Sequence, residues 1–509
     1  MAFPEDQFLT RKPGGAWTNH HGTVAVTAKA RWQIVNENQG APSLAGMKAT
    51  AERLQRLIQH ATAQNMRLRP MGSRWSFSEV SAPDNAWALE TQRLNYRFPV
   101  GKGSLDPAYK GTPADLYFVQ AGTSIAEINA DLEAKSGGLR ALRTSGASNG
   151  QTIAGALGTG THGSAIDSGA MESQVLGIQL LTGAKNLWIE HPDHPAMTAA
   201  FAAKLGAELK RDAKLFSAAL VSLGALGVVH SVLLSVVPRY RLRSFLKRMP
   251  MAQILPAMKT LDFRGVALPI PDKRPYFFQV VIDPANPLNG HVTTRYREDC
   301  PADYVTDNAQ KSGYEVGNDL PGFFGKLLEV APALRPAVVS AALISQLSPF
   351  DDKIGTPAET YTYTQSQAGT AGASIAVPAA RVDEALREAV DVFKTVPDAP
   401  AAFACRFAQA SPAMLGWTRF APSCMMDIDG IHTPAIGKLM AAVRTRFDAK
   451  GIPHCAHWGK LHDLTAARVQ SSYGDRLPDW HKVRETLMPD PKERAVFATD
   501  LLQRIGITR

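Results

Sequence analysis

Hydroxyl and glycine residues crowd one short turn near the start of the chain, Arg69-Pro70-Met71-Gly72-Ser73-Arg74-Trp75-Ser76-Phe77-Ser78. The apolar run 66–71 predicts a strand that stops at Gly72. Backbone N–H groups at the end of such a strand, beside serine hydroxyls, can form a nest for an anion such as phosphate. Taken alone, the pattern fits an ordinary turn at least as well.

A second stretch, residues 144–164, repeats glycines and hydroxyls more densely. Glycines let a backbone pass close to a flat or charged ligand, and hydroxyls donate to phosphate or to ring heteroatoms. The spacing from Gly155 to Gly160 resembles a degenerate dinucleotide fingerprint. However, no clean strand precedes it, no clear helix follows, and no suitable acidic residue comes after it. We therefore reject that fingerprint and expect another kind of ligand contact.

Hydrophobic periodicity predicts the elements that position these sites. Helices are expected at 45–65, 124–135 and 212–222, and strands at 116–120, 173–181, 186–189 and 228–237. From residue 241 the hydrophobic pattern changes. Strands are expected at 277–282, 360–363 and 373–377, and helical segments at 319–346 and 380–396. The pattern indicates an α+β protein with one domain at 1–240 and a second at 241–445. A helical segment, 446–509, follows around His457-Trp458-Gly459-Lys460.

Composition sets the remaining limits. The 509 residues, 45% of them hydrophobic, are enough for two or three domains. The formal net charge of +9 suits an anionic ligand such as a pyrophosphate, and the basic stretch 239–248 is interpreted as a solvated strand, not a nucleic-acid or membrane surface. We expect no secretory signal and no membrane span. The four cysteines form no CxxC pair, which predicts no metal site and a cytoplasmic protein.

Together these motifs resemble the vanillyl-alcohol-oxidase (PCMH) type of FAD-binding flavoprotein, and most closely its aldonolactone and alditol oxidase branch. The resemblance covers most of the first 240 residues and the last 60 or so. Five anchors occur in the family's order: Gly-Ser-x-x-Ser-Phe at 72–77, Gln-Thr-Ile-Ala-Gly-Ala at 151–156, Gly-Thr-Gly-Thr-His-Gly at 158–163, Leu-Gly-Ala-Leu-Gly-Val-Val at 223–229 and His-Trp-Gly-Lys at 457–460.

The resemblance implies a two-lobed FAD-binding domain built from the N- and C-terminal segments, with an α+β cap inserted between them. It implies that the first turn cradles the FAD pyrophosphate and that Val228 and Val229 meet the adenine end. The residues it places against FAD are Met71, Gly72, Ser73, Arg74, Trp75, Ser76, Phe77, Gly146, Ala147, Ser148, Gln151, Thr152, Gly155, Thr159, Gly160, Thr161, His162, Gly227, Val228, Val229 and Lys460.

Three departures from the family pattern bear on the chemistry. Many members carry a histidine, bonded covalently to the flavin, where this chain has Trp75, so we expect FAD to be held noncovalently. The family's Glu-x-Arg on a cap strand is similar to Ala404-Cys405-Arg406, where the arginine is kept and the carboxylate is lost. A substrate-facing serine of the alditol oxidases corresponds to Ala147. Gly146, before it, matches the position where oxidases are small enough to admit O₂.

The resemblance and the residue types together give candidates for catalysis. Lys460 and Arg406 are expected as cations near the flavin or substrate, and His457 either contacts the flavin or shapes its loop. For His162 a structural role in the FAD loop is favoured over that of a base. Asp427 and Asp429 alternate on a possible cap strand, so one could point at the flavin; the alternative is a solvated turn before Gly430.

The function expected from this resemblance is a FAD-dependent oxidoreductase that takes a hydride from a C–OH or C–N bond of a small molecule and passes electrons to O₂. One alternative is a flavin dehydrogenase with another acceptor. A second is a flavin-fold binding protein without turnover. Apolar neighbours of Arg406 in the sequence suggest a substrate more apolar than a polyol: Phe403, Ala404, Phe407, Met414 and Trp417. The sequence does not determine the oligomeric state.

Overall fold

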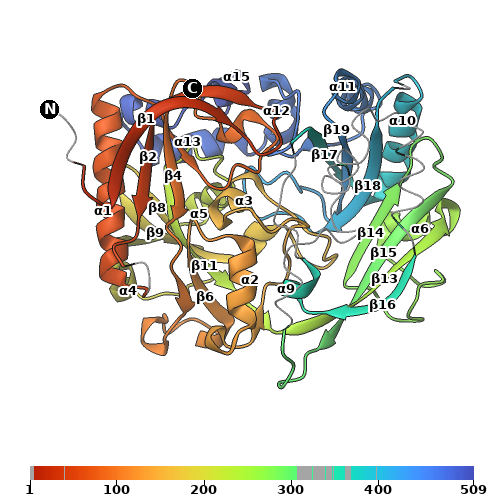
Figure 1. Ribbon diagram of the computed structural model, residues 1–509, viewed down its shortest axis with the longest axis horizontal. Helices are drawn as coiled ribbons and strands as arrows, with labels where there is room; N and C mark the ends of the chain where they lie inside the picture. Colours follow the sequence, from red (N-terminus) through yellow and green to blue (C-terminus); the bar gives the residue numbers. More distant parts are fainter. Residues whose placement is uncertain are drawn as a thin grey trace.

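The protein forms two halves that meet along a central seam in the computed structural model (Figure 1). The structure describes residues 5–38, 41–306, 349–361, 368–396 and 398–508, together with Phe324, Val339 and Leu347. Helices and strands are mixed in both halves, which confirms the predicted α+β class.

The chain begins with a four-stranded sheet in the order β1-β2-β4-β3. Helix α1, Leu44–Ala63, starts where the Ser43 hydroxyl accepts from the Gly46 N–H, and its apolar face, including Leu54 and Leu57, is fully buried. The helix leads into β3, which pairs parallel with β4 and ends where the glycine-containing turn begins. The strands are β1, Leu9–Thr18; β2, Ala25–Val35; β3, Leu68–Met71; and β4, Trp87–Arg93.

A six-stranded sheet in the order β10-β9-β8-β11-β6-β5 completes the first half. Its strands are β5, Arg97–Pro99; β6, Leu116–Gln120; β8, Val175–Leu181; β9, Asn186–Glu190; β10, Glu208–Arg211; and β11, Val228–Ser235. The accompanying helices are α2, Ile125–Glu133; α3, Ile153–Thr159; α4, Ala199–Lys204; and α5, Ala213–Leu220. A short pair, β7 (Arg140–Ala141) and β12 (Val237–Pro238), leads out of this half.

The second half is built on an eight-stranded sheet in the order β16-β13-β15-β14-β18-β19-β17-β20. The strands are β13, Tyr240–Pro250; β14, Phe277–Ile282; β15, Asn289–Asp299; β16, Phe350–Gly355; β17, Thr370–Pro378; β18, Ala401–Ala408; β19, Ser423–Ile431; and β20, Cys455–Ala456. Helices α6 (Met251–Thr260), α10 (Val382–Phe393) and α11 (Pro434–Ala449) pack with one face of this sheet in a hydrophobic core. A short helix, α9, covers Pro357–Thr360.

Alternation along the strands gives the cap sheet two chemically different faces. Phe278, Cys405 and Met426 point into the core under the helices. Their neighbours Arg406 and Asp427 point to the opposite face, because successive residues of a strand alternate. That opposite face is turned toward the first half of the molecule.

The C-terminal residues return to the first half. Helices α12 (Ala466–Tyr473), α13 (Leu477–Leu487), α14 (Pro491–Val496) and α15 (Asp500–Arg504) follow β20. Trp458 and Trp480 are buried in the same core cluster as Leu54 and Leu57 of α1. The core of the first half is therefore formed from both ends of the chain.

Some sequence expectations differ from the structure. The β-like run 360–363 begins with the last residue of helix α9, because the Thr356-Pro357-Ala358-Glu359 capping box starts a helical turn there. The helical segment expected at 319–346 lies outside the described residues, apart from Phe324 and Val339, which are helical. The boundary expected at residue 445 falls inside α11, and β20 beyond it belongs to the cap sheet.

Candidate functional site

The turn after β3 lies at the seam between the two halves. Gly72 packs against Thr152 so closely that a Cβ there would lie 2.0 Å from Thr152 Oγ1. The Phe77 N–H donates to the Gly459 carbonyl at 2.7 Å, and the Ser78 hydroxyl donates to the Trp458 carbonyl at 2.6 Å. Backbone contacts therefore join the first motif to the C-terminal motif.

The glycine-rich stretch folds around the same turn. The Ser73 hydroxyl donates to the Gly150 carbonyl at 2.6 Å and accepts from the Thr152 N–H at 3.2 Å. Helix α3 begins after Thr152 and ends at Gly160, which has a left-handed φ of +71°. As the sequence indicated, no helix directly follows Gly160; α3 itself was not predicted, because it is short and rich in small residues and its periodicity is therefore weak.

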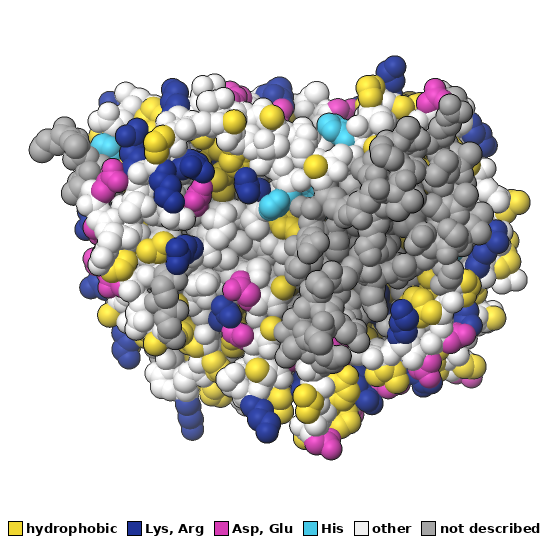
Figure 2. Space-filling view, in the orientation of Figure 1, with side chains coloured by type: hydrophobic (Ala, Val, Ile, Leu, Met, Phe, Trp, Pro, Cys, Tyr) yellow, Lys and Arg dark blue, Asp and Glu magenta, His cyan; other side chains and the backbone are white. Residues whose placement is uncertain are grey.

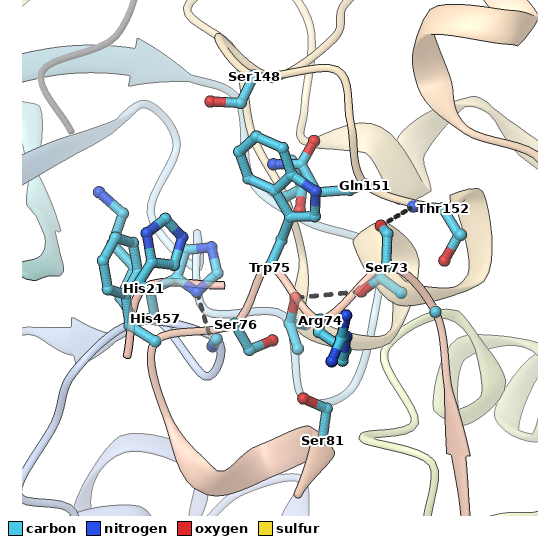
Figure 3. A pocket seen from close by; sticks show the side chains of 18 of the residues that line it. His21, Ser73, Arg74, Trp75, Ser76, Ser81, Ser148, Gln151, Thr152 and His457 are labelled. Carbon is cyan, nitrogen blue, oxygen red and sulfur yellow. Dashed lines mark hydrogen bonds between the residues drawn. The ribbon is translucent and has the colours of Figure 1, made fainter. Parts of the chain in front are cut away.

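Two adjoining cavities, of about 130 and 90 Å³, run along this surface. They share six lining residues: Gly72, Ser76, Ser81, Thr152, Gly155 and Thr159. The first cavity reaches Arg406, His457 and Lys460, whereas the second reaches Gly227 and Val229. In Figure 3 the Trp75 indole stands between Ser148 and Gln151 on one side and His21 and His457 on the other.

The structure brings nearly all the predicted cofactor residues to these cavities. The exceptions are Gly160 and Val228, which line neither. Val228 is buried in the core of the first half, and Gly160 accepts a hydrogen bond from Trp417 Nε1 at 2.7 Å. Asp427 is also absent from the cavity walls and lies buried behind Lys460.

Several buried polar atoms beside these cavities have no hydrogen-bond partner within the described part of the chain. They are Ser81 Oγ, Gln151 Oε1, Thr152 Oγ1 and the Nε and Nη1 atoms of Arg69. Burial lowers the pKa of Arg69 to about 10, so the guanidinium remains charged at neutral pH. A buried polar group without a partner costs about 1–3 kcal/mol, which a polar ligand would offset. The phosphates, hydroxyls and ring heteroatoms of FAD fit this donor and acceptor set.

A cluster of charges faces the cavity from the cap. Lys460 Nζ donates to Asp427 Oδ1 at 2.8 Å and to Asp429 Oδ1 at 3.3 Å. Arg406 Nε donates to Gln279 Oε1 at 2.8 Å and lies 3.7 Å from Asp427 Oδ2. The Ser374 hydroxyl also donates to Asp427. The solvated turn that the sequence left open for Asp427 and Asp429 is wrong, since both side chains are fully buried on β19.

The cluster remains ionised because its charges support one another. Burial alone would raise the pKa of Asp427, but Lys460 and Arg406 outweigh burial and hold that pKa below its ordinary value. Burial alone would lower the pKa of Lys460, but Asp427 and Asp429 raise it above its ordinary value. Lys460 therefore presents a stable positive charge at the cavity.

Two histidines, His162 and His457, line the cavity beside this cluster, and Trp417 packs against both. The centroids of His162 and His457 lie 6.1 Å apart, and Trp417 lies 5.0 Å from His162 and 4.6 Å from His457. Burial lowers the pKa of His162 to about 4 and that of His457 well below its ordinary value. Both rings are therefore neutral at physiological pH.

Sequence reasoning missed several lining residues, among them His21, Ser81 and Arg69. His21 comes from the turn between β1 and β2, stacks on Phe77 with ring centroids 3.7 Å apart, and faces Thr370 Oγ1 at 3.2 Å. Its partners lie far away in sequence, so no local pattern indicated it. Arg69 is the first residue of the recognised stretch 69–78 and Ser81 lies three residues beyond it, so their place in the sequence was the available signal.

The apolar neighbours that suggested an apolar substrate are directed elsewhere. Phe403 and Phe407 are fully buried in the core beneath the cap helices, and neither lines the cavity. Alternation along β18 explains this, because they flank Ala404 and Arg406 on the other face. The suggestion of an apolar pocket is therefore wrong for these residues.

Comparisons with known proteins agree with this geometry. Residues 47–188 match the FAD binding domain family, and residues 288–505 match the D-arabinono-1,4-lactone oxidase family. A D-arabinono-1,4-lactone oxidase of Yarrowia lipolytica is 29% identical over 203 residues, 40% of this chain and 34% of that protein. An L-gulono-1,4-lactone dehydrogenase of Mycobacterium tuberculosis is 23% identical over 478 residues, 91% of this chain and 96% of that protein.

The matches to two arabinonolactone oxidases span only about a third of those relatives, 34% and 32% of their lengths.

Solved structures show the same fold along the whole chain. A cholesterol oxidase from Brevibacterium sterolicum has a TM-score of 0.69 at 14% identity and covers 99% of this chain and 98% of its own. A VAO-type flavoprotein from Myceliophthora thermophila has a TM-score of 0.59 at 13% identity, covering 91% and 78%.

Within the described ranges no helix is long and apolar enough to cross a membrane, and no cluster of three or more acidic, histidine or cysteine side chains could hold a metal ion. The two matches cover residues 47–188 of the first half and residues 288–505 of the cap and C-terminal segment, and residues from both regions line the first cavity. The chain is thus similar to the FAD binding domain family in its first half and to the D-arabinono-1,4-lactone oxidase family in its cap and C-terminal segment, on a fold shared with a cholesterol oxidase and a VAO-type flavoprotein.

Proposed function

We propose that this protein is a FAD-dependent oxidase that removes a hydride from a C–OH bond, or a C–N bond, of a small molecule and passes the electrons to O₂. The observation that carries the proposal is the pair of adjoining cavities. The turn after β3 lines both cavities, and the Lys460–Asp427–Arg406 cluster lies at the end of the first. Bound FAD would supply the two-electron acceptor.

The chain's own residues would hold and polarise the reactants. Lys460 offers a charge that remains positive at neutral pH, and Arg406 lines the same cavity from the cap. Preorganised cations of this kind stabilise negative charge that develops as a hydride moves. Asp427 lies behind Lys460 and keeps its ammonium in place, so Asp427 is a positioning residue.

We propose that the substrate is polar and carries several hydroxyls, as an aldonolactone does. The relatives named for such lactones support this, and so does the polar face that β14, β18 and β19 turn to the cavity, with Gln279, Arg406 and the Lys460 cluster. Ala404 carries no carboxylate, but Asp427 lies directly opposite it on the neighbouring strand. An acidic side chain is therefore present next to this position.

We also propose that FAD is bound noncovalently. Trp75 supports this, because its indole nitrogen is no nucleophile toward the flavin methyl group. Purified protein should be yellow, and acid precipitation should leave the flavin in the supernatant. Flavin that stays with the precipitated protein would overturn this part of the proposal.

Reoxidation of the reduced protein tests the proposed acceptor. Gly146 lines the cavity beside Thr161, and a Cβ there would lie 3.0 Å from Thr161 Cγ2. We expect photoreduced protein to reoxidise within seconds of admitting air, and Gly146→Ala to slow that step by narrowing the approach. Reoxidation over minutes in the unchanged protein would instead favour a dehydrogenase with another acceptor, which is what the full-length mycobacterial relative is named for.

A further inference from the structure

His162 and His457 enter the first cavity from different segments, one from the loop after α3 and one from the loop after β20. Each ring has one nitrogen occupied by a backbone group at 2.9 Å. The Nε2 atom of each has no hydrogen-bond partner within the described residues. The two backbone contacts differ in kind, and that difference determines what each Nε2 can do.

The His162 ring is held by a carbonyl. Its Nδ1 lies 2.9 Å from the Gly163 oxygen, and a carbonyl oxygen only accepts hydrogen bonds. Nδ1 must therefore carry the proton. Because a neutral imidazole has a single N–H, the Nε2 of His162 has a free lone pair.

The His457 ring is held by an amide. The Gly459 N–H donates to its Nδ1 at 2.9 Å, so Nδ1 must be unprotonated. In the neutral ring the proton is then on Nε2, which makes that atom a hydrogen-bond donor. The same contact opposes a second proton on this ring, because a protonated Nδ1 would face the amide hydrogen.

Both rings remain neutral because of their surroundings. The groups that face His162 are Asp427 of β19, Arg406 of β18 and Lys460, and those that face His457 are His162, Lys460, Asp427 and His462. Burial lowers both pKa values; Lys460 adds to this at both rings and Arg406 at His162, whereas Asp427 opposes it. At neutral pH the two residues that line the cavity therefore carry one acceptor and one donor nitrogen.

We propose that this pair of opposite tautomers recognises and deprotonates the hydroxyl that is oxidised, with His162 Nε2 as the proton acceptor and His457 Nε2–H as the donor to the hydroxyl oxygen. The step, which rests on the function proposed above, balances as follows. The O–H proton would move to His162 Nε2 as the alcohol becomes a carbonyl, and FAD held by the cavity residues would supply the acceptor for the C–H hydride. The His162 imidazolium then releases its proton to solvent.

A weak base is sufficient for this role. The hydroxyl proton becomes strongly acidic as the hydride leaves carbon, so proton transfer late in the step needs little basicity. A base with a pKa of about 4 also remains unprotonated throughout the physiological range. This assigns His162 a catalytic role, in place of the structural one that the sequence favoured.

Nitrogen NMR of the FAD-loaded protein, with ¹⁵N-labelled histidine, tests the tautomers without turnover. His162→Gln and His457→Asn identify the two ring signals by their loss. We expect His162 protonated on Nδ1 and His457 protonated on Nε2 at neutral pH. The reverse tautomer at either ring, or a charged ring, would overturn the proposal.

Anaerobic flavin reduction by an aldonolactone tests the chemical step. His162→Gln keeps an acceptor oxygen near the Nε2 position but cannot take a proton, so we expect reduction to slow by about 100-fold or more, with bound FAD retained. The rate of the unchanged protein should fall as the pH approaches 4, and the variant should lose that dependence. Equal rates and equal pH profiles would overturn the assignment.

Two further outcomes separate this inference from the proposed function. If no hydroxylated substrate reduces the unchanged protein, the proposed function fails, while the NMR result still decides the tautomers. If His162→Gln does not retain FAD, the unchanged protein provides the test. We expect its rate of flavin reduction to show a solvent isotope effect and to fall at acidic pH. The absence of both would contradict the role of His162.

Discussion

Asp427 is the residue on which the charge cluster depends. Its fully buried carboxylate binds Lys460 and lies near Arg406, and these cations hold its pKa below the ordinary value despite burial. An acid with a lowered folded-state pKa stabilises the fold above its unfolded pKa of about 4, and that contribution is lost as the pH falls through the folded value. The cluster should therefore be intact over the whole neutral range.

Removing this charge should be costly. Asp427→Asn leaves Lys460 and Arg406 without their shared partner, and breaking a buried pair typically costs about 3–5 kcal/mol. Urea unfolding of the FAD-free variant measures this loss. Asp475→Asn is the matched control, because Asp475 pairs with Arg419 at 2.9 Å but is 61% exposed, and we expect a loss below about 1 kcal/mol. Equally small losses in both variants would contradict the account.

Trp75 makes a second test at this scale. Its indole lines the cavity. Trp75→Ala should weaken FAD binding about tenfold, or about 1.4 kcal/mol, by removing an aromatic contact, whereas Trp75→Phe should retain most of the affinity. Fluorescence titration of apoprotein with FAD measures both. An unchanged dissociation constant in Trp75→Ala would show that the ring only fills space.

Helix α3 shows how one element depends on a single glycine. Gly160 ends the helix with φ +71°, and a Cβ there would lie 2.9 Å from the Trp417 ring. Gly160→Ala should cost about 1–3 kcal/mol through the left-handed backbone and the displaced tryptophan, and should weaken FAD binding. Gly437→Ala in α11 is the control, because nothing lies within 4 Å of a Cβ there; it should be neutral or stabilising by about 0.5–1 kcal/mol. Thermal unfolding compares the two.

A buried carboxyl joins the FAD loop to the cap loop. Glu172 precedes β8, and its Oε1 accepts from the Ser411 hydroxyl at 2.5 Å. Burial raises the pKa of Glu172 to about 7, so the folded state holds a proton that the unfolded state has released. Stability should therefore fall as the pH rises from about 4.5 to 7, by up to about 3 kcal/mol, and stay level above that.

The variant Glu172→Gln tests this pH dependence, since it keeps the acceptor oxygen but cannot ionise. It should show a flatter stability profile and exceed the unchanged protein above pH 7, as measured by urea midpoints across the pH range. If the unfolding free energy of the variant fell as steeply between pH 4.5 and 7 as that of the unchanged protein, Glu172 would not be the cause of the pH dependence.

On the scale of the whole molecule, the cavity joins parts of the chain that are far apart. Its walls come from the N-terminal turn at His21, the glycine-rich loop, the cap at Arg406 and the C-terminal loop at Lys460. Acidic and basic side chains are interspersed on the described part of the face in Figure 2. A ligand that contacts all these segments should stabilise both halves together.

Binding should therefore raise the stability of the whole protein. Free FAD at about 100 times its dissociation constant should add about 2.7 kcal/mol to the unfolding free energy. Urea unfolding of apoprotein with and without FAD, followed by tryptophan fluorescence and by circular dichroism, measures this shift. A shift seen by only one probe, or none, would contradict a cofactor that spans both halves.

Local sequence patterns predicted most of what is local. The strands 116–120 and 277–282 were expected with the bounds that the structure shows, and the five motifs meet along one set of cavities. Contacts between distant segments could not be predicted from local patterns. His21 packs against Phe77 and Thr370. The burial of Asp427 depends on its contacts with Lys460 and Ser374. In the run 360–363, Thr360 ends helix α9 because the capping box at Thr356 starts a helical turn, whereas residues 362 and 363 lie outside the described residues.

The central claim is that this protein oxidises a hydroxylated small molecule with bound FAD. Anaerobic mixing of the yellow protein with aldonolactones and polyols tests it most directly, with flavin absorbance as the readout. We expect at least one hydroxylated compound to bleach the flavin, with recovery on admitting air. A colourless protein that does not take up FAD, or a flavin that no such compound reduces, would contradict the account.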